Sequence, residues 1–257
     1  MKKRNKTITY ITSIFVVGIL AFSVVYITKD NNKIPNDKIE KEKIPDKTKE
    51  KDTNSFGIET DVEELPNPPI ELTKLILPVE QNVQENGYYC VPATLQMLFK
   101  YKNISITQDQ LAIELNTSPE TGTEYIDLAR VANKYLFNNE NVGENDPGYH
   151  IQTINRYDDD PQIALDFERR VKTNISNNDP TFVAVDVNAL YPHLSSANHM
   201  VLLVGYSTFG NTDNIAYYYY IDPSYVVQDP IYGGLKIVTK EKLVDAIIQN
   251  VEPAYIW

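Results

Sequence analysis

The spacing of apolar side chains changes along the chain and divides its C-terminal part into two halves. From about residue 90 to residue 175, apolar positions recur every three or four residues, which is typical of helices with one buried face. The stretch Thr107-Gln108-Asp109-Gln110 also has the spacing of a capping box, which opens a helix. The predicted buried faces are Val91, Leu95, Leu98 and Phe99; Leu111, Ala112 and Leu115; Tyr125, Leu128, Ala129 and Ala132; and Ile163, Leu165, Phe167 and Val171.

After residue 180 the apolar positions alternate or run without interruption, as they do in β-strands. Helices that come first and antiparallel strands that follow are typical of an α+β domain. The sequence therefore predicts an α+β fold, and residues 71–257 have a comfortable length for one such domain. The predicted strands are 181–187, 200–206 and 216–221, followed by a helix at 239–250 and a closing strand at 254–257.

The N-terminus has a different pattern. Residues 7–28 contain no charged side chain and follow the basic start Met1-Lys2-Lys3-Arg4. An apolar run of this length can cross a bilayer as a helix, and the basic flank is expected to stay in the cytoplasm. Residues 1–28 are therefore predicted to be a membrane anchor that leaves the C-terminal domain outside the cytoplasm. A cleaved signal peptide is the alternative, with Ala21-Phe22-Ser23 as the cleavage site and a secreted protein as the product.

Residues 29–70 connect these two parts. They are rich in Lys, Asp, Glu and Pro and contain few apolar side chains. A segment of this composition cannot bury enough apolar surface to offset the entropy cost of ordering it. It is predicted to be a disordered linker, so the expected organisation is an anchor at 1–28, a linker at 29–70 and a folded domain at 71–257.

Charge is unevenly distributed along the chain. The net charge is −11, but residues 1–51 carry 12 basic and 6 acidic side chains, whereas the remainder carries 12 and 29, a balance of −17. This sign argues against nucleic acid as a partner, because phosphate binding requires a basic surface. An acidic surface would attract a cationic substrate, although a solvated acidic face is the simpler interpretation. The sequence contains no glycine-rich phosphate loop and no cysteine–histidine set suited to zinc, so no cofactor and no metal are expected.

Cys90 is the single cysteine of the chain, and it lies where a loop ends and the first predicted helix begins. The positive end of the helix dipole favours the thiolate over the thiol, and the thiolate is the form in which cysteine acts as a nucleophile. A lone cysteine is more commonly a small buried core residue. The choice between these interpretations depends on whether the chain supplies a base.

The chain offers three histidines as the base. His150 and His193 lie in predicted loops, whereas His199 directly precedes the strand at 200–206, where a side chain is held more rigidly. If residues 199–206 pair antiparallel with residues 215–222, His199 lies opposite Asp222, close enough for contact. Asp222 would then orient the imidazole ring and stabilise its cation. The alternative for Asp222 is a turn residue before a proline, which is a common role for Asp-Pro.

Hydrolysis of a carbonyl compound also requires donors for the oxyanion. The backbone N–H of Cys90 can supply one. A side-chain amide upstream can supply another, and Gln84 and Gln81 are the two candidates. Either glutamine could instead be a polar surface residue.

Three short blocks of the sequence resemble a known family. They are Gln84-x5-Cys90-x-Pro92-Ala93-x-Leu95-x-Met97-Leu98, Asn198-His199-x-Val201-Leu202-Leu203-Val204-Gly205-Tyr206 and Tyr220-Ile221-Asp222-Pro223. Their order and spacing resemble the papain-fold cysteine peptidases related to bacteriocin leader-processing (double-glycine) peptidases.

This resemblance implies a papain-like fold with the nucleophile at a helix N-terminus that packs on an antiparallel sheet. It also implies that Cys90 is the nucleophile, His199 the base, Asp222 the residue that orients the base, and Gln84 a part of the oxyanion hole. The expected partner is a peptide or protein substrate, with cell-wall peptide among the candidates.

The chain departs from the family in two ways. Val91 stands where the family often has glycine, and no transporter accompanies the domain, which the anchor would place outside the cytoplasm. The resemblance therefore predicts the fold and the chemistry but not the substrate. The sequence predicts an extracytoplasmic, membrane-tethered cysteine peptidase. The alternatives are a cell-wall amidase or peptidoglycan hydrolase on the same fold, a transglutaminase-like acyl transferase, and a catalytically inactive surface-binding module.

Overall fold

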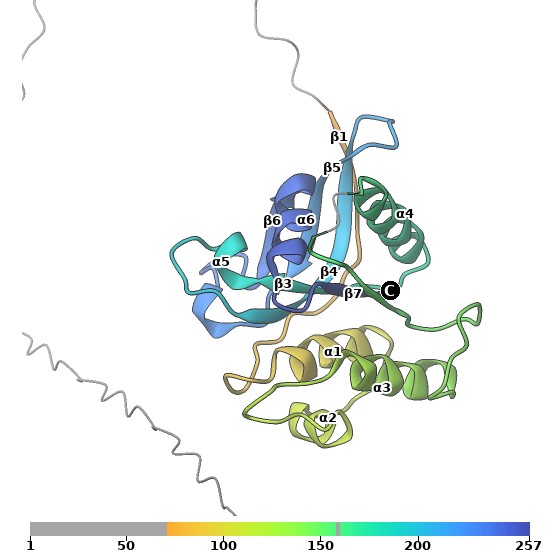
Figure 1. Ribbon diagram of the computed structural model, residues 1–257, viewed down its shortest axis with the longest axis vertical. Helices are drawn as coiled ribbons and strands as arrows, with labels where there is room; N and C mark the ends of the chain where they lie inside the picture. Colours follow the sequence, from red (N-terminus) through yellow and green to blue (C-terminus); the bar gives the residue numbers. More distant parts are fainter. Residues whose placement is uncertain (1–70, 158–159) are drawn as a thin grey trace, which may run out of the picture. The chain divides into compact units, whose positions relative to one another are not determined.

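The computed structural model describes residues 71–157 and 160–257, all of which belong to one compact unit (Figure 1). The predicted anchor at 1–28 and the predicted linker at 29–70 lie outside the described residues. The elements, in chain order, are β1 (Leu72–Ile76), α1 (Cys90–Tyr101), α2 (Gln108–Glu114), α3 (Tyr125–Phe137), β2 (Ile151–Thr153), α4 (Gln162–Ser176), β3 (Thr181–Asp186), α5 (Val187–Leu190), β4 (Asn198–Phe209), β5 (Ile215–Ile221), the 3-10 turn η1 (Tyr225–Val227), β6 (Leu235–Thr239), α6 (Lys240–Gln249) and β7 (Ala254–Ile256).

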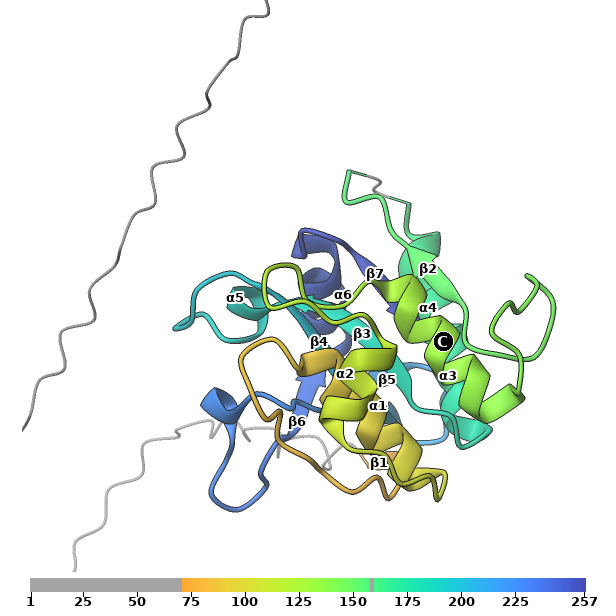
Figure 2. The same ribbon diagram turned by 90° about the horizontal axis from the view of Figure 1, so that it is seen from below.

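The described strands form one antiparallel sheet in the order β2-β7-β3-β4-β5-β6, and β1 pairs with the second half of β4. Helices α1, α2 and α3 lie together on one side of this sheet, and α4 and α6 lie on the other side (Figure 1). Seen from below, α1 and α2 lie in front of the strands (Figure 2). Every residue of β3 is buried, because helices cover both faces of the sheet at its centre. The predicted α+β class is confirmed.

Helix α1 has the buried face that its apolar spacing predicts. Leu95, Leu98 and Phe99 are fully buried, and the helix packs against β4. Pro92 is compatible with the first turn, where its missing N–H leaves no hydrogen bond unmade. Helix α2 begins with the predicted capping box between Thr107 and Gln110.

The predicted register between β4 and β5 is wrong by two residues at Leu203 and by three residues at Gly205 and Tyr206. The prediction pairs Leu203 with Tyr218, whereas the structure pairs Leu203 with Tyr220. Strand β4 runs on to Phe209, which shortens the connecting loop, and two register shifts absorb the additional residues. In this register His199 and Asp222 are not directly opposite each other. They lie diagonally on the same face, which is still within the reach of two polar side chains.

The described part of the chain contains no helix that is both long and apolar enough to cross a membrane. The anchor prediction concerns residues 7–28, which are not among those described.

Gly205 marks a close approach between strands. A Cβ atom at this position would lie 2.5 Å from the carbonyl oxygen of Leu75 and 2.8 Å from the Cα atom of Ile76. Strand β1 pairs with β4 at this point, so the absence of a side chain lets the two backbones meet.

Replacement of Gly205 by alanine is therefore expected to destabilise the domain. The added methyl group would push β1 away from β4, at a cost of about 1–3 kcal/mol in the free energy of unfolding. Gly87→Ala is the matched control, because a Cβ atom there meets nothing within 4 Å. Urea unfolding of the two variants measures the difference. Equal midpoints for Gly205→Ala and the wild-type chain would contradict this account of the β1–β4 contact.

Candidate active site

Cys90 is the first residue of α1, as predicted. The residue before the helix, Tyr89, gives no side-chain cap to the first turn. The backbone N–H groups of Val91 and of Met200 in β4 both act to lower the pKa of the Cys90 thiol. Thr94 closes the first turn through a hydrogen bond of 2.9 Å from its hydroxyl to the Cys90 carbonyl oxygen. The sulfur thus lies at the positive end of a helix and directly against the sheet.

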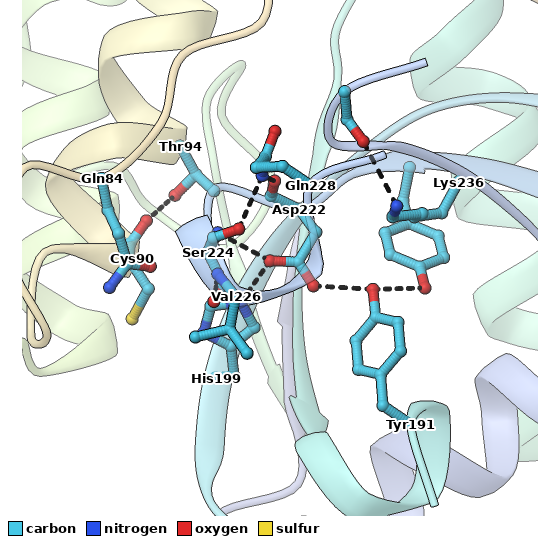
Figure 3. Close-up of polar contacts among 12 residues, drawn as sticks. Gln84, Cys90, Thr94, Tyr191, His199, Asp222, Ser224, Val226, Gln228 and Lys236 are labelled. Carbon is cyan, nitrogen blue, oxygen red and sulfur yellow. Dashed lines mark hydrogen bonds and ion pairs between the residues drawn. The ribbon is translucent and has the colours of Figure 1, made fainter. Parts of the chain in front are cut away.

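His199 connects Cys90 with Asp222. Its Nε2 atom lies 2.8 Å from Oδ1 of Asp222, and its ring lies beside the Cys90 side chain, with which it lines one cavity. Figure 3 shows the sulfur, the imidazole ring and the carboxylate following one another where α1 meets the first residues of β4. The three predicted residues come from distant parts of the chain, and the structure brings them together.

Asp222 is almost completely buried and follows the last residue of β5. Its Oδ1 atom also accepts a hydrogen bond of 2.8 Å from the backbone N–H of Ser224. This bond forms an Asx turn, so the turn interpretation of Asp-Pro is correct alongside the contact with His199. The other oxygen, Oδ2, accepts a hydrogen bond of 2.8 Å from the hydroxyl of Tyr191.

Tyr191 also belongs to the site, although the sequence pattern does not predict it. It follows α5, and its hydroxyl lies 3.1 Å from that of Tyr220 in β5 as well as against Asp222. Nothing in the local pattern distinguishes it from the rest of the 18 tyrosines of the chain. Its contact with Asp222 depends on the path of the connection between β3 and β4, which no local spacing reveals.

The pKa of the Cys90 thiol is lowered from its ordinary value. Burial opposes ionisation and would raise this pKa, but the hydrogen bond with His199 and the charge of that ring outweigh burial, and the N–H groups of Met200 and Val91 add to them. The thiolate is therefore favoured over the thiol.

The pKa values of the other two groups move in the direction that supports this thiolate. Burial alone would lower the pKa of His199, but the charge of Asp222, the hydrogen bond with it and the contact with Cys90 raise the pKa to about 10. Burial would raise the pKa of Asp222, yet the charge and hydrogen bond of His199 and the donors Ser224 and Tyr191 lower it. These shifts favour the imidazolium of His199 and the carboxylate of Asp222, and the neighbouring imidazolium in turn favours the thiolate of Cys90 over its thiol.

The two upstream glutamines have different positions. Gln84 is buried next to Cys90 (Figure 3). Its Nε2 atom donates a hydrogen bond of 2.7 Å to the Asn86 carbonyl, and its buried Oε1 atom has no hydrogen-bond partner among the described residues. The backbone N–H of Gln84 donates to the carbonyl of Pro223, which joins this loop to the segment after Asp222. Gln81 instead accepts hydrogen bonds from the backbone N–H groups of residues 234 and 235. Of the two candidates, only Gln84 lies at the site.

The remaining histidines have other partners. His150 stacks near Trp257 at the C-terminus, and its Nε2 atom contacts the Asp146 carbonyl. His193 packs edge-on against Tyr191. Within residues 71–157 and 160–257, no group of three or more metal-ligating side chains comes together.

A cavity of about 230 Å³ opens beside the candidate site, which we call the Cys90 cavity. Cys90 and His199 both line it, together with Glu120 on a turn between α2 and α3, Tyr125 at the start of α3, and Asn198. A larger hollow of about 350 Å³ next to Tyr255 contains neither Cys90 nor His199. Volume alone therefore does not locate the site, whereas the reactive groups do.

The solved structures that are similar to this chain include the following three. One is a putative C39-like peptidase from Bacillus anthracis, with 17% identity, a TM-score of 0.46 and coverage of 72% of this chain and 96% of that one. The second is the peptidase domain of Streptococcus ComA, a bifunctional ABC transporter involved in quorum sensing. It has 16% identity and a TM-score of 0.41, with coverage of 70% of this chain and 96% of that one. The third is a double glycine motif protease from an AMS/PCAT transporter in complex with the leader peptide. It has 14% identity and a TM-score of 0.41, with coverage of 70% of this chain and 91% of that one. No curated protein matches the chain.

The family assignment rests on the sequence match. Residues 76–247 match the model of the Peptidase_C39 like family, and this segment is more than half of the 257 residues. It includes Gln84, Cys90, His199 and Asp222. The chain belongs to the peptidase C39-like family and is a cysteine peptidase.

Proposed function

We propose that this protein is an extracytoplasmic, membrane-tethered peptidase that hydrolyses peptide bonds through Cys90, His199 and Asp222. The observation that carries the proposal is that Cys90, at the N-terminus of α1, lies beside the imidazole of His199, which in turn hydrogen-bonds to the carboxylate of Asp222. A nucleophile, a base and a residue that orients the base are the three roles that such hydrolysis requires. Cys90 and His199 border a cavity that gives a substrate access.

In the first step the Cys90 thiolate attacks the carbonyl carbon of the scissile peptide bond. The imidazolium of His199 then gives its proton to the leaving amine, and the C–N bond breaks to leave a thioester on Cys90. In the second step neutral His199 takes a proton from water, which attacks the thioester and releases the acid product. Asp222 keeps the ring oriented and stabilises its positive charge in both steps.

The tetrahedral intermediates place negative charge on the former carbonyl oxygen. The backbone N–H of Cys90 and the side-chain amide of Gln84 are the proposed donors. The hydrogen bond to Asn86 fixes the orientation of the Gln84 amide and engages one of the two hydrogens on Nε2. The second hydrogen is available for the oxyanion.

Cleavage of unstructured peptides by the purified full-length chain tests this function. Cys90→Ala is expected to abolish cleavage, and Gln84→Ala to lower kcat about 10²- to 10³-fold, because one oxyanion donor is lost. Gln81→Ala is the matched control, since its amide binds residues 234 and 235. Mass spectrometry of a peptide mixture detects the new termini. Cleavage that persists in Cys90→Ala, or no cleavage by the wild-type chain, would refute the proposal.

The same preparation distinguishes the alternatives on this fold. Faster turnover of murein fragments than of peptides would favour a cell-wall amidase. Incorporation of a fluorescent amine into the acyl product would favour an acyl transferase. Loss of a cellular phenotype in Cys90→Ala argues against a module that only binds a surface.

The location outside the cytoplasm is supported by the uncharged residues 7–28 and their basic flank. Because Cys90 is the only cysteine, a membrane-impermeant maleimide reports on the side of the membrane that the domain occupies. Labelling of the full-length chain on intact cells is expected, and Cys90→Ala should show none. Labelling that appears only after lysis would place the domain in the cytoplasm.

Tyr191 is proposed as a positioning residue that acts through Asp222. Its hydroxyl is the donor to Oδ2, so it helps to hold the buried carboxylate ionised and aligned with His199. Removal of a donor to a charged, buried group commonly costs about 1.5–3 kcal/mol.

Tyr191→Phe is therefore expected to lower kcat about tenfold with little change in KM, because Asp222 contacts His199 rather than substrate. The pKa of Asp222 should rise when its donor is lost, so the acid limb of the kcat profile should move to higher pH. Tyr220→Phe is the matched control, since its hydroxyl touches Tyr191 but not Asp222. An equal loss in both variants with no shift of the acid limb would show a merely structural role.

A further inference from the structure

The Cys90 cavity has an unbalanced charge. The ionisable side chains on its wall are those of Tyr88, Cys90, Glu120, Tyr125 and His199. Among the described residues that line the cavity, Glu120 supplies the only carboxylate. No lysine or arginine is among the described residues that line it. A volume of about 230 Å³ is smaller than a pocket for a whole drug-sized ligand. A substrate side chain inside it therefore lies close to both Cys90 and Glu120.

A tight turn holds Glu120 at this wall. Ser118 and Gly122 exchange two backbone hydrogen bonds of 2.8 Å, and Gly122 adopts a left-handed φ of 75°. The hydroxyl of Ser118 donates a hydrogen bond of 2.7 Å to Oε2 of Glu120. The carboxylate is exposed to solvent, yet its position on the turn is defined.

Tyr125 also lines a second cavity, of about 370 Å³. We call it the Ile126 cavity. Its wall is mainly aliphatic, with Ile126, Ile151 and Ile154, and its charged groups are the carboxylates of Glu124 and Glu252. As in the Cys90 cavity, the described lining contains no lysine or arginine.

Hydrogen bonds connect Tyr125, which lines both cavities, to the strand that carries His199. The Asn198 side chain accepts hydrogen bonds from the Tyr125 hydroxyl (3.3 Å) and from Asn250 (2.9 Å), and it donates one of 3.1 Å to the Glu252 carboxylate. Asn198 immediately precedes His199 in β4. Glu252 is therefore fixed relative to the reactive groups by a network whose member Asn250 is fully buried.

The reactive groups add no positive charge to compensate for these carboxylates. The Cys90–His199 pair has no net charge whether the shared proton is on the sulfur or on the ring, Asp222 adds one negative charge, and three further carboxylates border the two cavities. A cleft lined by one sign of charge concentrates ligands of the opposite sign and accelerates their association. Acidic segments of a substrate would be repelled from the same surface.

We propose that the preferred substrates are extended peptides with a lysine or arginine next to the scissile bond and aliphatic side chains further along. The cationic side chain would occupy the Cys90 cavity against Glu120, and the aliphatic ones the Ile126 cavity. The inference rests on the proposed peptidase function and adds to it the chemical class of the substrate. The competing interpretation is that these carboxylates are simply part of a solvated acidic surface.

The test starts from one peptide that the full-length chain cleaves in a Cys90-dependent manner. Lysine, glutamine and glutamate are placed in turn at each position around the cleaved bond, and kcat/KM is measured for every peptide. At the position that enters the Cys90 cavity, lysine is expected to exceed glutamine by about 2- to 5-fold, which is the range of one exposed ion pair. Glutamate should be the poorest of the three.

Two further measurements assign the preference to Glu120. In Glu120→Gln the ratio of kcat/KM for the lysine peptide to kcat/KM for the glutamine peptide should fall towards one. Glu144 is an exposed acid outside both cavities, so Glu144→Gln should keep the wild-type ratio. Added salt should reduce the ratio in the wild-type chain, because exposed charges are screened within about 10 Å at 0.1 M.

The outcomes separate this inference from the function on which it rests. Cys90-dependent cleavage with no lysine preference at any position, or with the same ratio in Glu120→Gln, would overturn the substrate class and leave the peptidase proposal standing. The absence of any Cys90-dependent cleavage would overturn the proposed function itself.

Discussion

The hydrogen bond between His199 and Asp222 is the interaction on which the candidate site depends. A carboxylate that is 1% exposed is stable in its charged form only if donors surround it. His199, Ser224 and Tyr191 supply these donors. The buried negative charge then favours the imidazolium, and the imidazolium favours the thiolate of Cys90. The charge of Asp222 thus stabilises the charge of His199, and the charge of His199 stabilises the thiolate of Cys90.

Contacts between the helices and the sheet hold Cys90, His199 and Asp222 together. Cys90 begins a helix that packs on β4, and Met200 in β4 lines the same cavity as Cys90. The loop before Cys90 is fixed to the segment after Asp222 through the hydrogen bond from Gln84 to Pro223. Residue 234 is glycine because a Cβ atom there would lie 2.3 Å from the Asp222 carbonyl oxygen. These contacts place reactive groups on rigid elements, as a preorganised site requires.

Local patterns predicted much of this arrangement, and the parts they missed depend on long-range geometry. The start of α1 at Cys90 and the capping box of α2 follow from neighbouring residues, so both could be read from the sequence. The short elements β1, β2, α5 and β6 could not, since three to five residues carry little periodicity. The predicted β4–β5 register was wrong because no residue pattern indicates the two register shifts between these strands. The contact between His199 and Asp222 was nevertheless predicted, because a two-residue slip keeps both on the same face.

The central claim is that the charge of His199, held by Asp222, keeps Cys90 ionised. The pH dependence of iodoacetamide alkylation of the full-length chain tests it most directly, because only the thiolate reacts. The expected midpoint for the wild-type chain lies below the ordinary cysteine value of about 8.5, and the midpoint for His199→Ala should rise to that value or above it. A wild-type midpoint near 8.5, unchanged in His199→Ala, would contradict the account.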